Sequence, residues 1–149
     1  MSRVPRAAAG PRSAFPVFRW PVRVYWEDTD AGGVVYHASY LRFLERARSE
    51  WLRSHGVAQQ RLRAEHGILF VVCEMNIRFL APARLDDELD VTVEKFARRS
   101  ASIAFAQCIL RPVDRAKLIE ADVRAACIDA QSYRPCRIPD FLLAENLDA

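Results

Sequence analysis

Lysine is almost missing from this sequence of 149 residues. It occurs only at positions 95 and 117, so 22 − 2 = 20 of the 22 basic residues are arginine. The arginines are dispersed, and no long basic stripe is interleaved with aromatic residues, so we do not expect nucleic acid as a partner. The formal net charge of +3 and the pI of about 8.8 fit a small acidic ligand better.

Several patterns that define catalytic or metal sites are also absent. No GxSxG, HExxH or Walker motif occurs, which argues against the serine hydrolase elbow, the common zinc proteases and P-loop nucleotide binding. The four cysteines form no CxxC pair. The segment DTDAG differs from a calcium loop, because Gly32 stands where that loop needs a ligand. We therefore expect no metal site.

Long apolar runs are missing too. None approaches the roughly 20 residues of a membrane-spanning helix, and the N-terminus has no apolar stretch typical of a secretory signal. The four cysteines are therefore expected to be reduced, small and buried. Hydrophobic residues make up 51% and charged residues 28% of the chain, which predicts one globular domain. Residues 1–17 are expected to form a flexible tail, and residues 18–149 the domain.

The pattern of apolar residues predicts a strand, a helix and then further strands. Residues 18–26 alternate as a half-buried strand does, with Trp26 on the buried face and Pro21 at a sheet edge. A helix is predicted to begin at His37 or Ala38 and to end at Gly56, with Tyr40, Leu44, Ala47 and Trp51 as its apolar stripe. A short second helix is predicted over 58–65, followed by four strands over 68–80, 89–96, 103–109 and 118–128. A curved antiparallel sheet around one long helix, an α+β fold, satisfies this order.

A dense group of polar residues lies between the first strand and the long helix. It consists of Glu27, Asp28, Thr29, Asp30, Tyr36 and His37. The first turn of a helix has unpaired amides that can hold an oxyanion. A neighbouring carboxylate could attack an activated acyl group or activate a water molecule. Taken alone, the same residues also fit an ordinary turn with a helix cap, and a histidine that is only structural.

The segment VRVYWEDTDAGGVVYHASYLRFLERARSE resembles the hotdog-fold thioesterases of the 4-hydroxybenzoyl-CoA thioesterase superfamily. It is most similar to the bacterial Tol–Pal-associated acyl-CoA thioesterases (YbgC type). The later runs APARLDDEL and RPCRIP also resemble that family, and the most specific element is D-x-D-x-x-G-x-V-Y-H over 28–37. One departure is Trp26, where the family commonly has tyrosine. The resemblance implies a long helix cradled by a five-stranded antiparallel sheet.

The resemblance also implies the reaction and its residues. It implies hydrolysis of an acyl-CoA thioester to free acid and CoA, with Asp30 as nucleophile or general base and His37 in the site. Backbone amides around Tyr36, His37 and Ala38 would polarise the thioester carbonyl. No cofactor is expected, since coenzyme A is part of the substrate. Its phosphates favour cationic contacts, for which the candidates are Arg98, Arg99 and Arg137.

Expectations about partners come from the same resemblance. It implies a homodimer or homotetramer, and a free sheet edge would invite such pairing. It also implies a cytoplasmic protein, with acyl carrier protein and the inner face of the membrane as further contacts. The alternative is a hotdog module that binds an acyl group or acyl carrier protein without cleaving it. Acyl length stays open at this stage.

Overall fold

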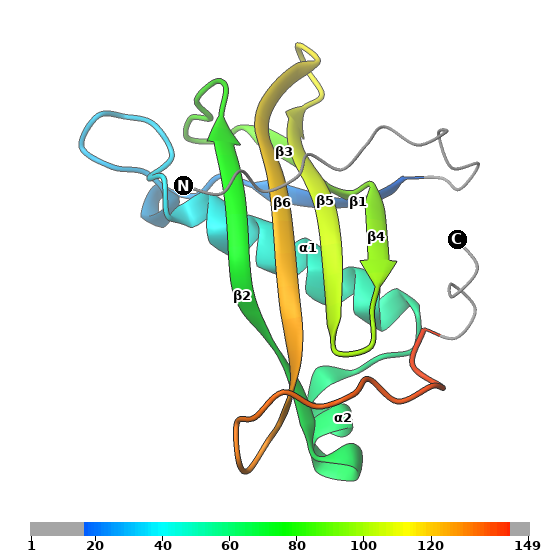
Figure 1. Cartoon of the computed structure of the whole chain (residues 1–149). Helices are drawn as coiled ribbons and strands as arrows, with labels where there is room; N and C mark the ends of the chain where they lie inside the picture. The colour runs from blue at the N-terminus through cyan, green and yellow to red at the C-terminus, as the bar shows by residue number, and fades with distance from the viewer. Residues whose placement is uncertain (1–16, 144–149) are drawn as a thin grey trace, which may run out of the picture.

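The computed structural model describes residues 17–143. Two helices, six strands and one 3-10 turn follow one another along the chain (Figure 1). Their order and bounds are β1 (Phe18–Arg23), η1 (Trp26–Asp28), α1 (Ser39–Ser54), α2 (Gln59–His66), β2 (Ile68–Phe79), β3 (Glu88–Val93), β4 (Lys95–Arg98), β5 (Ser102–Arg111) and β6 (Ala116–Asp129).

The strands form one antiparallel sheet in the order β1-β3-β5-β6-β2, and β4 pairs with β5. Helix α1 runs across one face of this sheet (Figure 1). Its buried residues include Phe43, Leu44 and Ala47, each fully shielded from solvent, and they pack into the core with the inner side chains of the strands. The predicted α+β arrangement of a helix cradled by a sheet is confirmed.

The sheet has six strands because the segment predicted as one strand over 89–96 is interrupted. Val91 pairs with Ile109 in β5, but Lys95 pairs with Ala106, so one extra residue lies on this side. The Thr92 hydroxyl fills the gap in the ladder, accepting the amide of Cys108 at 2.9 Å. The interruption is therefore a bulge within the predicted strand.

Two predictions about side-chain burial were wrong. Strand β1 ends at Arg23, and Trp26 lies in the following 3-10 turn with 79% of its surface exposed, because the alternating pattern stops before it. Cys73 is exposed rather than buried, because β2 is an outer strand of the sheet and bulges at this residue. Cys108 and Cys127 are buried as expected, whereas Cys136 is only partly buried.

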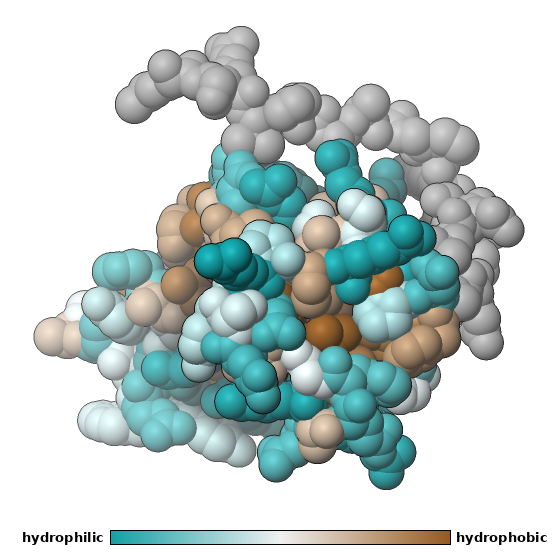
Figure 2. Space-filling model, turned by 60° about the horizontal axis from the view of Figure 1, so that its bottom comes forward, coloured by the Kyte–Doolittle hydropathy of each residue, from teal (hydrophilic) through white to brown (hydrophobic). Residues whose placement is uncertain are grey.

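Helix α1 begins at Ser39, one residue beyond Ala38, and its predicted apolar stripe is buried. Helix α2 ends at Gly67, whose φ of 64° allows the left-handed turn that starts β2. Figure 2 shows the lower face of the molecule, where hydrophobic surface is set among hydrophilic side chains. Neither helix of residues 17–143 has the length and apolar character needed to cross a bilayer. The predicted tail lies outside this range, apart from Val17.

Candidate active site

The predicted polar group forms a narrow loop that is closed at its base. Thr29 and Val35 face each other in an antiparallel bridge, and the amide of Asp30 donates to the carbonyl of Val34 at 2.9 Å. Gly33 lies in the turn with a φ of 78°, a backbone conformation that would be strained in a residue with a side chain. The loop therefore returns the chain from Asp30 directly to the start of α1, where it lies beside the helix in Figure 1.

The Asp30 carboxylate is exposed and only partly engaged. Its Oδ1 accepts the amide of Gly32 at 2.8 Å, and its Oδ2 has no hydrogen-bond partner within residues 17–143. A Cβ atom at position 32 would lie 3.1 Å from Oδ1, so glycine leaves the space in which the carboxylate sits. One oxygen is thus oriented by the backbone, and the other is open to a water molecule or an acyl carbon.

Asp28, two residues earlier, has the opposite surroundings. It is buried, and its Oδ2 accepts the amide of Tyr25 at 2.8 Å. Its Oδ1 is paired with the Arg42 guanidinium at 3.3 Å, which also donates to the Ser39 hydroxyl. Asp28 therefore fixes the loop to the first turn of α1 and is not accessible to a substrate.

The amides at the helix start are not equivalent. The amide of Tyr36 donates to the carbonyl of Asp28 at 2.8 Å, so it is already occupied. The amides of His37 and Ala38 find no acceptor within the described part of the chain. The positive end of the helix dipole lies at this point. Of the three amides expected to polarise a carbonyl, only those of His37 and Ala38 are therefore free to bind one.

His37 is exposed, and its ring lies 4.4 Å from the ring of Tyr36 between centroids. Neither ring nitrogen makes a hydrogen bond to a residue of the range 17–143. The structure thus brings His37 and Asp30 to the same end of α1 without a direct hydrogen bond between them.

A second loop, residues 81–87, holds the first one against α1. The Ala83 amide donates to the Tyr40 hydroxyl at 3.0 Å, and its carbonyl accepts the amide of Val35 at 2.9 Å. Val34 and Arg84 form a further bridge. Burial raises the pKa of the Tyr40 hydroxyl above its ordinary value.

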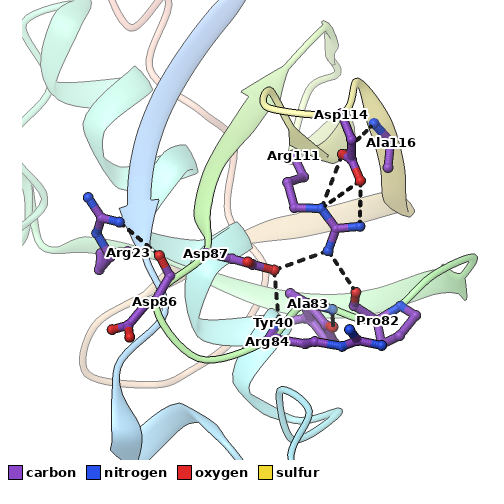
Figure 3. A network of polar contacts seen from close by, with 10 residues as sticks. All are labelled: Arg23, Tyr40, Pro82, Ala83, Arg84, Asp86, Asp87, Arg111, Asp114 and Ala116. Atoms are coloured by element: carbon purple, nitrogen blue, oxygen red, sulfur yellow. Dashed lines mark hydrogen bonds and ion pairs between the residues drawn. The ribbon is translucent and has the colours of Figure 1, made fainter.

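Arg111 of β5 anchors that second loop (Figure 3). Its guanidinium donates to the carbonyl of Pro82 at 3.1 Å and to Asp87 at 3.0 Å, and it also pairs with Asp114. Asp87 in turn accepts the amide of Arg84 at 2.9 Å. The APARLDDEL run therefore connects β5, through Arg111, with the loop around Asp30 and holds that loop in place. Its letters alone did not indicate this connection, because Arg111 is distant in sequence.

The arginines predicted to bind CoA phosphates lie at the other end of α1. Arg98 and Arg99 belong to the β4–β5 hairpin, and Phe96 of that hairpin packs on Trp51 near the helix end, with ring centroids 4.5 Å apart. Arg98 donates to the carbonyls of Ile138 and Pro139, and Arg137 pairs with Asp140. The structure brings the three arginines close to one another, but not to Asp30. Within residues 17–143 no cluster of His, Cys, Asp or Glu could hold a metal ion.

Comparison with known proteins agrees with this arrangement. Residues 24–145 match the thioesterase-like superfamily. The chain is 50% identical over 129 residues to the acyl-CoA thioester hydrolase YbgC of Escherichia coli O6:H1, covering 87% of this chain and 95% of that protein.

Solved structures show the same fold. A probable thioesterase from Bartonella henselae is 37% identical with a TM-score of 0.71, covering 83% of this chain and 98% of that one. A 1,4-dihydroxy-2-naphthoyl-CoA thioesterase from Synechocystis has a TM-score of 0.80 at 23% identity, covering 90% of this chain and 99% of that one. The second likeness concerns the fold alone.

Proposed function

The chain belongs to the thioesterase-like superfamily, and from this membership we propose that it is an acyl-CoA thioesterase with Asp30 as its catalytic carboxylate. The activity is supported by the relatives, of which the YbgC protein is half identical over nearly its whole length. The role of Asp30 is supported by one observation above all. A half-free, exposed carboxylate lies on the loop closed by the Thr29–Val35 bridge, and two unoccupied amides follow that loop at the helix start.

In the proposed reaction the thioester carbonyl oxygen accepts hydrogen bonds from the amides of His37 and Ala38. These hydrogen bonds stabilise the negative charge that develops on the oxygen. Asp30 then acts by one of two routes. As a nucleophile, its oxygen attacks the acyl carbon, CoA leaves as thiolate, and water cleaves the resulting anhydride. As a base, it takes a proton from water, and the hydroxide formed attacks the acyl carbon before the thiolate leaves.

Single turnover in labelled water separates the two routes. Label recovered in the Asp30 carboxylate supports the anhydride, and label recovered only in the released acid supports the base. His37 is proposed to orient the water or to move a proton, since its ring lies at the same helix end and is free to do so.

We also propose that a second copy pairs along β2. This strand ends the sheet, and it exposes apolar side chains that a monomer would leave in water. Among them Val72 is 48%, Phe79 53% and Leu80, next to the strand, 44% exposed. In such an assembly, the CoA phosphates at the site of one copy would be bound by Arg98, Arg99 or Arg137 of the other copy.

Two further contacts implied by the family resemblance, with acyl carrier protein and with the inner face of the membrane, stay proposals. The net charge of +3 has the sign that attraction to an acidic protein or an anionic membrane surface requires, and this is its only support for the two contacts. Each is tested by co-sedimentation with the isolated carrier protein or with vesicles of anionic lipid.

The function itself is tested by thiol release from short, long and aromatic acyl-CoAs. We expect release of CoA with one equivalent of free acid for at least one class. Tight binding of acyl-CoA with no release from any class would instead support the alternative, a hotdog module that holds its ligand intact.

A further inference from the structure

Arg48 of α1 is a buried cation that the proposed reaction does not use. Its residue surface is only 6% exposed. One nitrogen, Nη1, donates to Oε1 of Gln107 at 3.0 Å, and no carboxylate of residues 17–143 forms an ion pair with the guanidinium. Burial lowers the pKa of Arg48 from its ordinary value, which reflects the cost of keeping the charge away from water.

Gln107 positions Arg48 but does not neutralise it. Its amide nitrogen donates to the carbonyls of Leu44 at 3.1 Å and Thr92 at 3.2 Å, so the side chain is locked between α1 and the sheet. The amide oxygen is neutral and accepts only one of the five guanidinium N–H groups. Nε and Nη2 of Arg48 have no partner among residues 17–143 and are not sealed from the solvent, so an anionic group that enters the cavity lined by Arg48 can reach them.

The space in front of Arg48 can hold such a group. A cavity of about 80 Å³ lies between α1 and the strands β2, β5 and β6. That volume is several times the roughly 10–15 Å³ that one buried water requires. Its walls are largely apolar, and the residues that line it are Glu45, Arg48, Ser49, Leu52, Gln59, Phe70, Val72, Ile103, Phe105 and Ala125.

One face of α1 connects this cavity with the helix start. Residues 38, 41, 45, 48 and 52 follow the alternating three and four spacing that places side chains along one helical face. Strand β2 accompanies the helix at both ends, because Phe79 meets Tyr40 with centroids 6.0 Å apart and Phe70 lines the cavity beside Arg48. The rise from Ser39 to Arg48 is about 9 × 1.5 Å, or ~13.5 Å.

We propose that Arg48 selects acyl groups ending in a carboxylate, which it binds in this cavity while the thioester carbonyl lies at the amides of His37 and Ala38. The inference rests on the proposed thioesterase function and names its substrate class, the CoA half-thioesters of dicarboxylic acids. The apolar walls fit the methylene chain, and the guanidinium fits the carboxylate in two-pronged geometry.

Glu45, one turn before Arg48, lines the same cavity and sets a limit on this selectivity. Its carboxylate is exposed and accepts the Ser49 hydroxyl at 3.0 Å. Its negative charge acts on the Arg48 guanidinium and repels an anionic substrate, so removing it is expected to have the opposite effect to removing Arg48. The two residues therefore form a matched pair for mutation.

The test compares kcat/KM for thiol release from dicarboxylic half-thioesters of CoA with that from plain acyl-CoAs of equal chain length. The natural protein is expected to favour the carboxylate at one length by roughly tenfold or more, as a charged hydrogen bond implies. Arg48→Met is expected to abolish the preference, and Glu45→Gln to increase it. Arg46→Met, which changes an exposed arginine of the same helix, is the matched control and leaves the preference as it was.

Two results overturn the proposal: no preference at any chain length in the natural protein, or a preference that survives Arg48→Met. The second result would mean that a residue other than Arg48 binds the substrate carboxylate. If Arg48→Met does not fold, Arg48→Lys decides, since it keeps the charge but loses the two-pronged geometry and must reduce the preference. Failure to release thiol from either series contradicts the thioesterase function itself, whereas equal cleavage of both contradicts only the role of Arg48.

Discussion

Asp28 and Asp30 are separated by a single threonine, yet their surroundings give the two carboxylates different roles. Asp28 is 3% exposed, accepts a hydrogen bond from the Tyr25 amide and forms an ion pair with Arg42. Asp30 is exposed, at the first position of the turn that the loop makes, and it has one oxygen free. At the scale of single residues, the site thus depends on one carboxylate that builds the loop and another that the loop presents.

Substituting these two aspartates is expected to affect stability differently. Asp28→Ala leaves a buried amide and Arg42 without their partner, so the free energy of unfolding should fall by about 1–3 kcal/mol. Asp30→Ala removes only an exposed hydrogen bond and should change it by less than about 0.5 kcal/mol. Urea denaturation followed by circular dichroism measures both. Equal losses for the two variants would contradict the assigned roles.

The cysteines are expected to differ in reactivity with pH. Burial, and then the contact with Cys136, raises the pKa of Cys127 to about 12 from the ordinary 9.0. The fold therefore favours the protonated thiol, and this contribution to stability is complete below pH 9 and lost as the pH rises through about 12. At pH 9, alkylation followed by peptide mapping should label exposed Cys73 and spare Cys127. Rapid native labelling of Cys127 would contradict this.

At the scale of elements, β2 has two roles. Its inner side chains pack into the core with α1, and its outer edge pairs with no other strand of residues 17–143. The bulge at Cys73 shifts the register between Val72 and Glu74 without interrupting the pairing with β6. The unpaired edge is where the proposed second copy joins.

Val72→Lys is therefore expected to convert the assembly to monomers, because a charge on the apolar edge opposes pairing with another copy. Val113→Lys, in the turn between β5 and β6 and 90% exposed, is the matched control and should leave the assembly unchanged. Sedimentation velocity measures the mass of both variants. A natural protein that sediments as a monomer, or a Val72→Lys variant that stays assembled, would contradict the proposal.

The sequence was sufficient to predict most elements, because apolar periodicity reports burial of one face directly. The helix over 39–54 and the strands that follow it were predicted in this way. The bulge at Thr92 and the exposure of Trp26 were not, since both depend on partners distant in sequence. Arg48 also escaped notice for this reason. A charged residue among others on a helix looks solvated until the sheet that covers it is known.

At the scale of the whole molecule, the fold separates two ends of α1. The loop with Asp30 and the open amides lies at the helix start, and the hairpin with Arg98 and Arg99 lies near its end. The D-x-D-x-x-G-x-V-Y-H string was sufficient to predict the polar loop next to the helix start, and the roles of Asp30 and His37 stay predictions. The support through Ala83 and Arg111, and the loss of the Tyr36 amide to Asp28, required the tertiary structure.

The central claim, that the exposed carboxylate of Asp30 performs thioester hydrolysis, is tested most directly by the kcat of Asp30→Asn with the best acyl-CoA substrate. Asparagine keeps the shape and the oxygen that accepts the Gly32 amide, but it can neither attack nor take a proton. We predict a loss of at least about a hundredfold in kcat with the fold intact by circular dichroism. The matched control Asp122→Asn, which changes an exposed carboxylate of β6, should keep full activity. A folded Asp30→Asn protein that hydrolyses the substrate at the natural rate would contradict the claim.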